Sequence, residues 1–154
     1  MSELKSRLQS DLTQAMREKD EVTLGTVRMA LTAITNAEVS GKQARELTDD
    51  EVIGVLATEA KKRREAATSY DEAGASERAE QERAELLVIT RYLPSQLSDD
   101  ELHQIVASAV ETVAAEGKTG PSAMGAVMKL VQPQVKGRVD GSLVATLVKQ
   151  LLAQ

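Results

Sequence analysis

The sequence predicts an all-α fold, and three observations support that prediction. Only two of the 154 residues are aromatic, both Tyr, so the core must consist of aliphatic side chains, whereas strands usually carry more aromatic residues and Thr. Apolar residues recur at the three- and four-residue spacing of a helix with one buried face. Helix-capping signals separate these stretches from one another. No segment shows the alternation of a half-buried strand.

The first two predicted elements are helices separated by a short turn. The first spans about Glu3 to Glu18, because leucines recur there every four residues at Leu4, Leu8 and Leu12. Asp20 can cap the second helix, which ends before Ser40. Its apolar stripe consists of Leu24, Val27, Leu31 and Ile34. A polar loop from Gly41 to Glu46 follows it.

The next two predicted helices are long and highly charged. Thr48 and Glu51 have the spacing of a capping box, which begins a helix of about Asp49 to Glu72. Gly74 ends that helix, and another follows from about Ser76 to Tyr92. Pro94 ends the fourth helix, since proline disfavours helical geometry in the residue before it.

Three shorter helices are predicted for the rest of the chain. Ser98 and Glu101 repeat the capping pattern at the start of a helix that reaches about Ala115. Pro121 suits the first turn of a second helix, ending near Val131. Asp140 caps the last one, Gly141 to Leu152.

The sequence Leu-Pro-Ser-Gln-Leu at residues 93–97 separates the four long helices from the three short ones. We therefore predict an elongated N-terminal helical domain over residues 1–93, a hinge at 94–97 and a small three-helix tail domain over 98–154. At 154 residues the chain can form one medium domain or two small ones, with enough length for a core of its own.

Charge is distributed unevenly along the chain. The net charge is −5, yet the segment from Gly117 to Gln154 has five basic residues and one acid, Asp140. Its candidate nucleic-acid-binding residues are Lys129, Lys136, Gly137 and Arg138. Gly137 permits a tight turn between two cations, and the N–H groups at the start of the last helix can receive a phosphate. The alternative is an interhelix turn with incidental charge.

A second basic run, Lys61 to Arg64, lies in the third predicted helix. Its helical period places Arg63 on the apolar stripe and Arg64 at the edge, with Lys61 and Lys62 facing away. We predict that Lys61, Lys62 and Arg64 contact nucleic acid and that Arg63 packs its stem and pairs with a carboxylate. The alternative is a solvated charge run offset by neighbouring glutamates. Without Phe or Trp, contacts to RNA would involve phosphate and sugar rather than base stacking.

Residues suited to catalysis are scarce. The chain has no Cys, and its one histidine, His103, is predicted to lie on an exposed helix turn. The spacings typical of serine nucleophiles, zinc proteases, calcium loops and phosphate-cradling glycine loops are absent. We predict that the protein is not an enzyme and has no cofactor, no metal and no small-molecule substrate.

Composition also bears on location. Absence of Cys is typical of a reducing compartment. The start of the chain is charged, unlike a secretory signal, and no apolar run reaches membrane-spanning length. We therefore expect a cytoplasmic protein without a membrane partner.

Four segments resemble a known family when taken together and in order. They are V-R-M-A-L-T-A-I-T-N-A-E within Leu24 to Glu38, K-K-R-R-E-A within Glu51 to Tyr70, Y-L-P-S-Q-L-S from Tyr92, and M-G-A-V-M with P-Q-V-K-G-R-V-D-G from Met124. Over essentially its whole length the chain resembles the GatB/YqeY family in its free-standing YqeY-like form. The resemblance implies a helical bundle with a small helical tail domain.

In that family, the same unit forms the C-terminal region of the GatB subunit of tRNA-dependent amidotransferases, and it is appended to some glutaminyl-tRNA synthetases. There it resembles a tRNA-contacting accessory module, and the amide transfer occurs in other domains. The resemblance thus implies a non-catalytic accessory protein that binds tRNA through its basic C-terminal surface. A carbon–nitrogen ligase activity with glutamine as amido donor belongs to the fused relatives. The alternative is a protein-interaction module that docks through an apolar groove onto an amidotransferase, an aminoacyl-tRNA synthetase or another partner.

Overall fold

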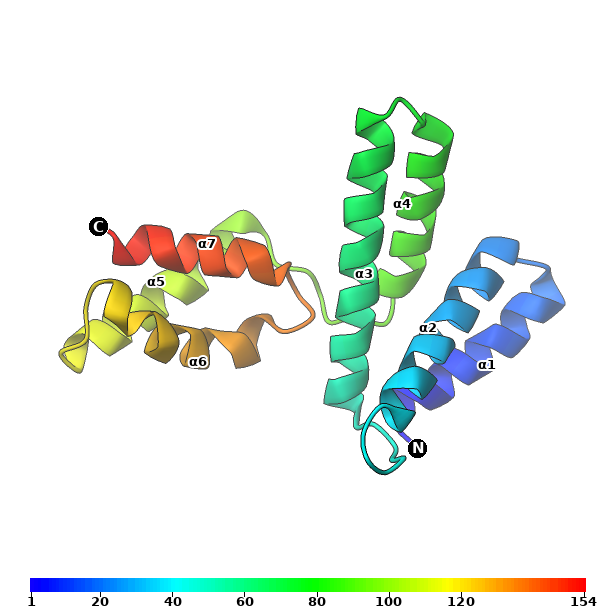
Figure 1. The fold of residues 1–154 in the computed structure, drawn as a ribbon, viewed down its shortest axis with the longest axis horizontal. Coiled ribbons are helices and arrows are strands. Elements are labelled where there is room, and N and C mark those ends of the chain that lie inside the picture. Colours follow the sequence, from blue (N-terminus) through cyan, green and yellow to red (C-terminus); the bar gives the residue numbers. More distant parts are fainter. The chain divides into compact units, whose positions relative to one another are not determined.

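The computed structural model describes all 154 residues, which form helices and loops without strands, so the all-α prediction is confirmed (Figure 1). The chain's internal contacts group it into two compact units, Met1–Leu93 and Pro94–Gln154. The first contains α1 (Glu3–Glu18), α2 (Glu21–Val39), α3 (Asp49–Glu72) and α4 (Ser76–Thr90). The second contains α5 (Asp99–Ala115), a 3₁₀ turn η1 (Pro121–Ala123), α6 (Met124–Val135) and α7 (Gly141–Leu152). No helix combines the length and the continuous apolar run that crossing a bilayer requires.

Two helical hairpins, α1–α2 and α3–α4, make up the first unit (Figure 1). The second helix, α2, packs against both helices of the other hairpin. Aliphatic side chains at helical spacing fill the space between the hairpins, as the composition requires. The largest fully buried members of this core are Leu8, Val27, Ile34, Val52, Leu56 and Ile89.

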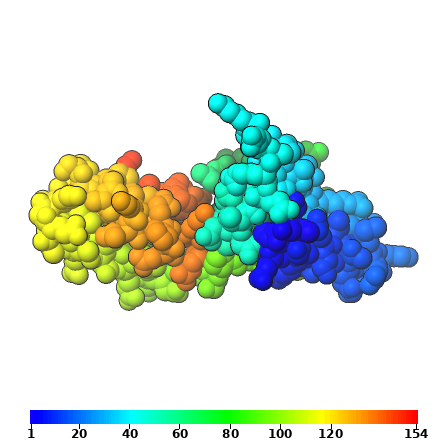
Figure 2. All heavy atoms as spheres, turned by 90° about the horizontal axis from the view of Figure 1, so that it is seen from below, coloured from blue at the N-terminus to red at the C-terminus, as the bar shows by residue number.

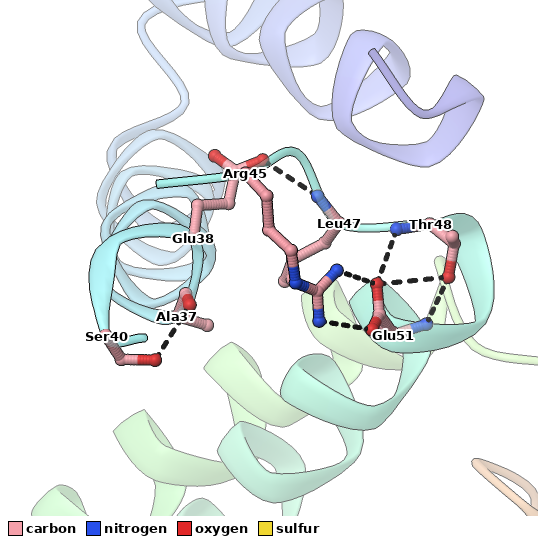
Figure 3. Close-up of polar contacts among 7 residues, drawn as sticks. All are labelled: Ala37, Glu38, Ser40, Arg45, Leu47, Thr48 and Glu51. Carbon is pink, nitrogen blue, oxygen red and sulfur yellow. Dashed lines mark hydrogen bonds and ion pairs between the residues drawn. The ribbon is translucent and has the colours of Figure 1, made fainter. Parts of the chain in front are cut away.

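Side-chain caps begin α1, α2 and α3. Ser2 accepts a hydrogen bond from the amide of Lys5, and Asp20 accepts one from Thr23. At α3 the predicted capping box is confirmed: the Glu51 amide donates to Thr48 Oγ1 at 3.3 Å, and the Thr48 amide donates to Glu51 Oε2 at 2.9 Å (Figure 3). These bonds satisfy amides that have no partner inside the helix.

Polar contacts hold the ends of the loop between α2 and α3, which projects from the surface of its unit (cyan in Figure 2). Arg45 forms a bidentate ion pair with Glu51, at 2.6 and 2.9 Å (Figure 3). Glu38, buried at the end of α2, accepts from Lys5 of α1 and from the Leu47 amide at 3.1 Å. The hydrogen bond from Lys5, followed by the one from Leu47, lowers the pKa of Glu38 below its ordinary value. One carboxylate thereby connects α1, α2 and the loop.

Valine dominates the core of the second unit. Val106, Val127, Val131, Val144 and Val148 are each fully buried where α5, α6 and α7 meet. Small branched side chains let short helices approach closely and give a dense core without aromatic residues.

The structure corrects two predicted helix ends. The helix expected to end near Val131 continues through Pro133 to Val135. Val135 extends the stripe of Val127 and Val131 and is 3% exposed, so its burial outweighs the loss of the Pro133 amide. The fourth helix ends at Thr90, because the amides of residues 91–93 bond three residues back, in the tighter pattern that often ends a helix.

Candidate nucleic-acid interface

The basic corner predicted from the sequence is a tight turn between α6 and α7. Lys136 leaves the helical conformation, and Gly137 follows at φ 74°, a left-handed value that glycine adopts without strain. The Arg138 amide then donates to the Val135 carbonyl oxygen at 2.9 Å, closing the turn. Gly137 itself is buried, so it contributes backbone geometry and not an exposed surface.

Residues 95–97 hold this turn from outside, and we call them the strap. Gln96 Nε2 donates to the Gly137 carbonyl oxygen at 3.0 Å. The Leu97 amide donates to the Arg138 carbonyl oxygen at 2.9 Å, and Arg138 Nε donates back to the Ser95 carbonyl oxygen at 2.9 Å. These three hydrogen bonds join the strap to the turn at residues 137–138, about 40 residues later in the chain, and hold the turn in place within the second unit.

Much of the Arg138 guanidinium is therefore used within the fold. Besides Ser95, it donates from Nη1 to the Gln134 carbonyl oxygen at 3.2 Å, and the side chain is half-buried. Such bonds to backbone carbonyls hold the planar group in one orientation. Arg138 thus supports the turn through Nε and Nη1, and this role does not depend on its other N–H groups.

Lys129 and Lys136 differ from Arg138 because both are exposed. They lie two helical turns apart, on one face of α6 and its C-terminal cap. An α-helix rises 1.5 Å per residue, so about 10 Å of helix axis separates them. The structure therefore places two exposed cations along one side of α6, next to a turn that the strap holds.

The start of α7 differs from the sequence-based expectation of a phosphate-receiving helix end. Asp140 Oδ1 accepts from the Ser142 amide at 2.9 Å and from its hydroxyl at 3.0 Å. The cap places a carboxylate at the positive end of the helix dipole, where it competes with any other anion. The amides of α7 are thus a poor phosphate receptor.

Charge in the second unit is segregated rather than uniformly positive. Residues 94–154 include six acidic and five basic side chains. The acids concentrate in α5 and just after it, at Asp99, Asp100, Glu101, Glu111 and Glu116. All five cations follow α5 in the chain. Three of these cations, Lys129, Lys136 and Arg138, belong to α6, its C-terminal cap and the turn that follows it.

On α3, the structure divides the basic run as its helical period predicts. Lys61 and Lys62 are exposed, Arg64 is half-buried and Arg63 is 4% exposed. Lys62 forms a surface ion pair with Glu59 at 3.2 Å. These residues belong to the first unit and Lys129 to Arg138 belong to the second, so the two sets of candidates occupy separate bodies.

Arg63 is the centre of a buried polar cluster. Its guanidinium pairs with Glu59 of α3 at 3.0 Å and with Glu85 of α4 at 3.5 Å, and it contacts Met29 of α2. Burial, and then the neighbouring Glu85 charge, raise the pKa of Glu82 above its ordinary value. As expected from the sequence, Arg63 packs and pairs inside the bundle, where it is unavailable to RNA.

Two structural features had no sequence signal. The strap residue Gln96 lies in a segment predicted only as a hinge, and its partner Gly137 is distant in the chain. A polar pocket of about 200 Å³ lies beside Tyr92, whose hydroxyl donates to Asp11 Oδ2 at 2.6 Å. The Arg7 guanidinium lies over the Tyr92 ring, 4.7 Å from its centre. Burial, and then the bond to Asp11, raise the pKa of Tyr92 above its ordinary value.

The fold and this surface define an all-helical protein with two small cores, in which two exposed lysines, Lys129 and Lys136, lie along α6 and at the turn that the strap holds. The chain belongs to the YqeY-like family: the family model described as Yqey-like protein matches residues 5–152. One similar protein is "Altered inheritance of mitochondria protein 41, mitochondrial" from Pyrenophora tritici-repentis (strain Pt-1C-BFP), which is 29% identical over 150 residues. The match covers 95% of this chain and 79% of that protein, whose name places it in mitochondria.

Proposed function

We propose that this protein is a non-catalytic accessory factor that binds tRNA, with Lys129 and Lys136 contacting backbone phosphates. The observation that carries the proposal is the pair of exposed lysines along one face of α6, beside a turn that the strap holds in place. Because the turn is already held in place, binding need not order its backbone, which lowers the conformational entropy that the protein loses. Membership of the YqeY-like family agrees with an accessory role.

The low aromatic content of the chain favours contact with phosphates over base recognition by stacking. The chain has two tyrosines and no Phe or Trp. Tyr92 is 6% exposed and hydrogen-bonded to Asp11, so it offers no stacking surface. A protein of this kind recognises a folded RNA by its shape and backbone.

Gly137 and Arg138 have a supporting role in this proposal. They form the turn that keeps Lys136 in position, and their carbonyl oxygens accept the two strap bonds from Gln96 and Leu97.

On the first unit, Lys61, Lys62 and Arg64 form a second candidate contact with tRNA, which is tested separately.

The test measures the affinity of purified tRNA for the full chain across a salt series. Lys129→Ala/Lys136→Ala is compared with Lys118→Ala/Lys149→Ala, which removes the same charge from exposed sites elsewhere in the unit. We expect the first variant to weaken binding and to reduce the slope of log K against log salt by about two units, one per lost phosphate contact. The control should shift the affinity only slightly. Equal behaviour of the two variants, or unchanged affinity in both, would reject the interface.

Absence of catalysis is the second part of the proposal. His103 is exposed on α5 and is the only imidazole in the chain. We expect purified protein to release no ammonia from glutamine, with or without tRNA and ATP. Ammonia release that follows the protein through successive purification steps would overturn this part and leave tRNA binding to be judged by the salt series.

A further inference from the structure

A largely apolar groove of about 350 Å³ lies between α5 and α7 in the second unit. The α5 side of the groove is lined by Leu102 and His103, with Asp99 and Asp100 one helical turn earlier. The α7 side is lined by Leu143 and Leu147, among others. The Thr146 hydroxyl, also in the lining, already donates to the Ser142 carbonyl oxygen inside α7. Gln150 completes the lining, so α7 offers the groove two leucines and one exposed amide side chain.

One large apolar side chain of α7, Leu143, remains exposed outside the core of its unit. Val144, Val148 and Leu152 face inward and are buried. Leu143 and Leu147 lie one turn apart and both line the groove; Leu147 is half-buried and also packs against the core, whereas Leu143 is 54% exposed. Apolar residues spaced by one turn along a groove match the anchors with which an amphipathic helix docks.

Charge at the groove identifies the occupant more closely. Asp99 and Asp100 are exposed, and neither carboxylate forms a hydrogen bond or ion pair within the chain. The cap of α5 is formed by their neighbours Ser98 and Glu101. No Lys or Arg lines the groove. The two acids complement the α5 dipole, and they also repel phosphate and attract a cation. The groove is thus unsuited to RNA and suited to an apolar segment with a basic end.

We propose that the α5–α7 groove binds an amphipathic helix of a partner protein. The helix presents aliphatic side chains at i, i+3 or i+4, and i+7, and a Lys or Arg at the end that meets Asp99 and Asp100. This surface is separate from the lysines of α6. The protein can therefore hold a partner through α5 and α7 while its basic side binds tRNA.

The probe is a displayed library of Ala-rich helical peptides with aliphatic residues at i, i+3, i+4 and i+7 and randomised charges at both ends. The library is selected against the immobilised full chain. We expect the enriched peptides to carry Lys or Arg at one particular end. Their affinity should fall at least tenfold on Leu143→Ser, and the fold of that variant is checked by circular dichroism. Leu130→Ser, at a leucine of α6 that is 41% exposed and outside the groove, is the matched control and should bind normally.

Charge reversal provides the second arm. Selection against Asp99→Lys/Asp100→Lys should enrich Asp or Glu at the peptide end where the native chain selects Lys or Arg. Failure of any peptide to enrich, binding that survives Leu143→Ser, or an unchanged charge preference would each overturn the proposal. So would a dimer of this chain that Leu143→Ser abolishes, because the groove would then belong to a second copy, or a loss of tRNA binding in that variant. The salt series with Lys129→Ala/Lys136→Ala is independent of all these outcomes.

Discussion

Gln96 Nε2 lies 3.0 Å from the carbonyl oxygen of Gly137, and this bond joins the segment before α5 to the turn before α7. The same amide group also donates to the Pro94 carbonyl oxygen at 3.1 Å. Gln96, which was predicted to lie in a hinge, thus connects two segments of the second unit by a hydrogen bond. The position of Lys136 depends on it, since Lys136 and Gly137 are neighbours in the chain.

Replacing Gln96 with Ala should destabilise the second unit by about 1 kcal/mol, because the bonds from its amide are lost while their acceptors remain. Urea unfolding of the variant measures the change in free energy. Gln104→Ala, at an exposed position on α5, is the control and should have little effect. Similar losses in the two variants would show that the strap bond contributes nothing specific.

Lys19 ends α1 at φ 57°, a left-handed conformation that is unfavourable for a residue with a side chain. Its backbone amide donates to the Ala15 and Met16 carbonyl oxygens, so the conformation is required by the cap. Lys19→Gly should therefore raise stability by about 1 kcal/mol, less the entropy that glycine adds to the unfolded chain. Thermal unfolding of Lys19→Gly and of Lys19→Ala checks this: the glycine variant should have the higher midpoint, and the reverse order would contradict the strain argument.

Glu38→Gln should destabilise the first unit more than Glu46→Gln does. Glu38 is buried between Lys5 and the Leu47 amide, so the neutral amide leaves the lysine without its counter-charge. Glu46 makes an exposed pair with the N-terminal ammonium group, a kind of pair that contributes little. Comparing denaturation midpoints of the two variants distinguishes the sites. Equal midpoints would show that the carboxylate at position 38 is replaceable.

Acid should weaken the α2–α3 connection. The Arg45 guanidinium, and then the Thr48 amide, lower the pKa of Glu51 from 4.5 to about 2. Because the folded state binds this proton more weakly than the unfolded chain, the stabilisation is complete above pH 4.5 and is lost as the pH falls toward about 2. Urea unfolding at pH 6 and pH 3 should show a smaller loss for Glu51→Gln than for the native chain. Glu65→Gln, at an exposed site on α3, should keep the native pH dependence.

Arg63→Ala should be far more harmful than Arg64→Ala, although the residues are adjacent. Removing the buried Arg63 leaves Glu85 without an ion pair and Glu59 with only the exposed Lys62, and breaking a buried pair typically costs about 3–5 kcal/mol. Arg64 is half-buried and forms no ion pair. The unfolding free energies of both variants test this difference. If tRNA binding depends on the α3 run, Arg64→Ala should lower affinity without lowering stability.

Local signals explain how much of the fold the sequence predicts. The capping box of Thr48 and Glu51 and the leucine repeat of α1 act within a few residues, so their helices begin and end where predicted. The period of α3 separates Arg63 from Lys61 and Lys62 for the same reason. The helix predicted to end near Val131 continues to Val135, because the burial of Val135 depends on packing against other helices and has no local signal.

For the candidate site, the sequence identified the cations but not what each one does. Lys136 and Arg138 look equivalent in the chain, yet one is exposed and the other donates to the carbonyl oxygens of Ser95 and Gln134. Nothing in the sequence pairs Gln96 with Gly137, or Leu143 with Asp99, because these relationships join segments that are far apart in the chain. The sequence by itself determined helix positions, capping and the charge of each segment, since these depend on near neighbours. Tertiary packing alone decided which charged and apolar groups are left for a partner, because a side chain is exposed only where the core and its hydrogen bonds do not use it.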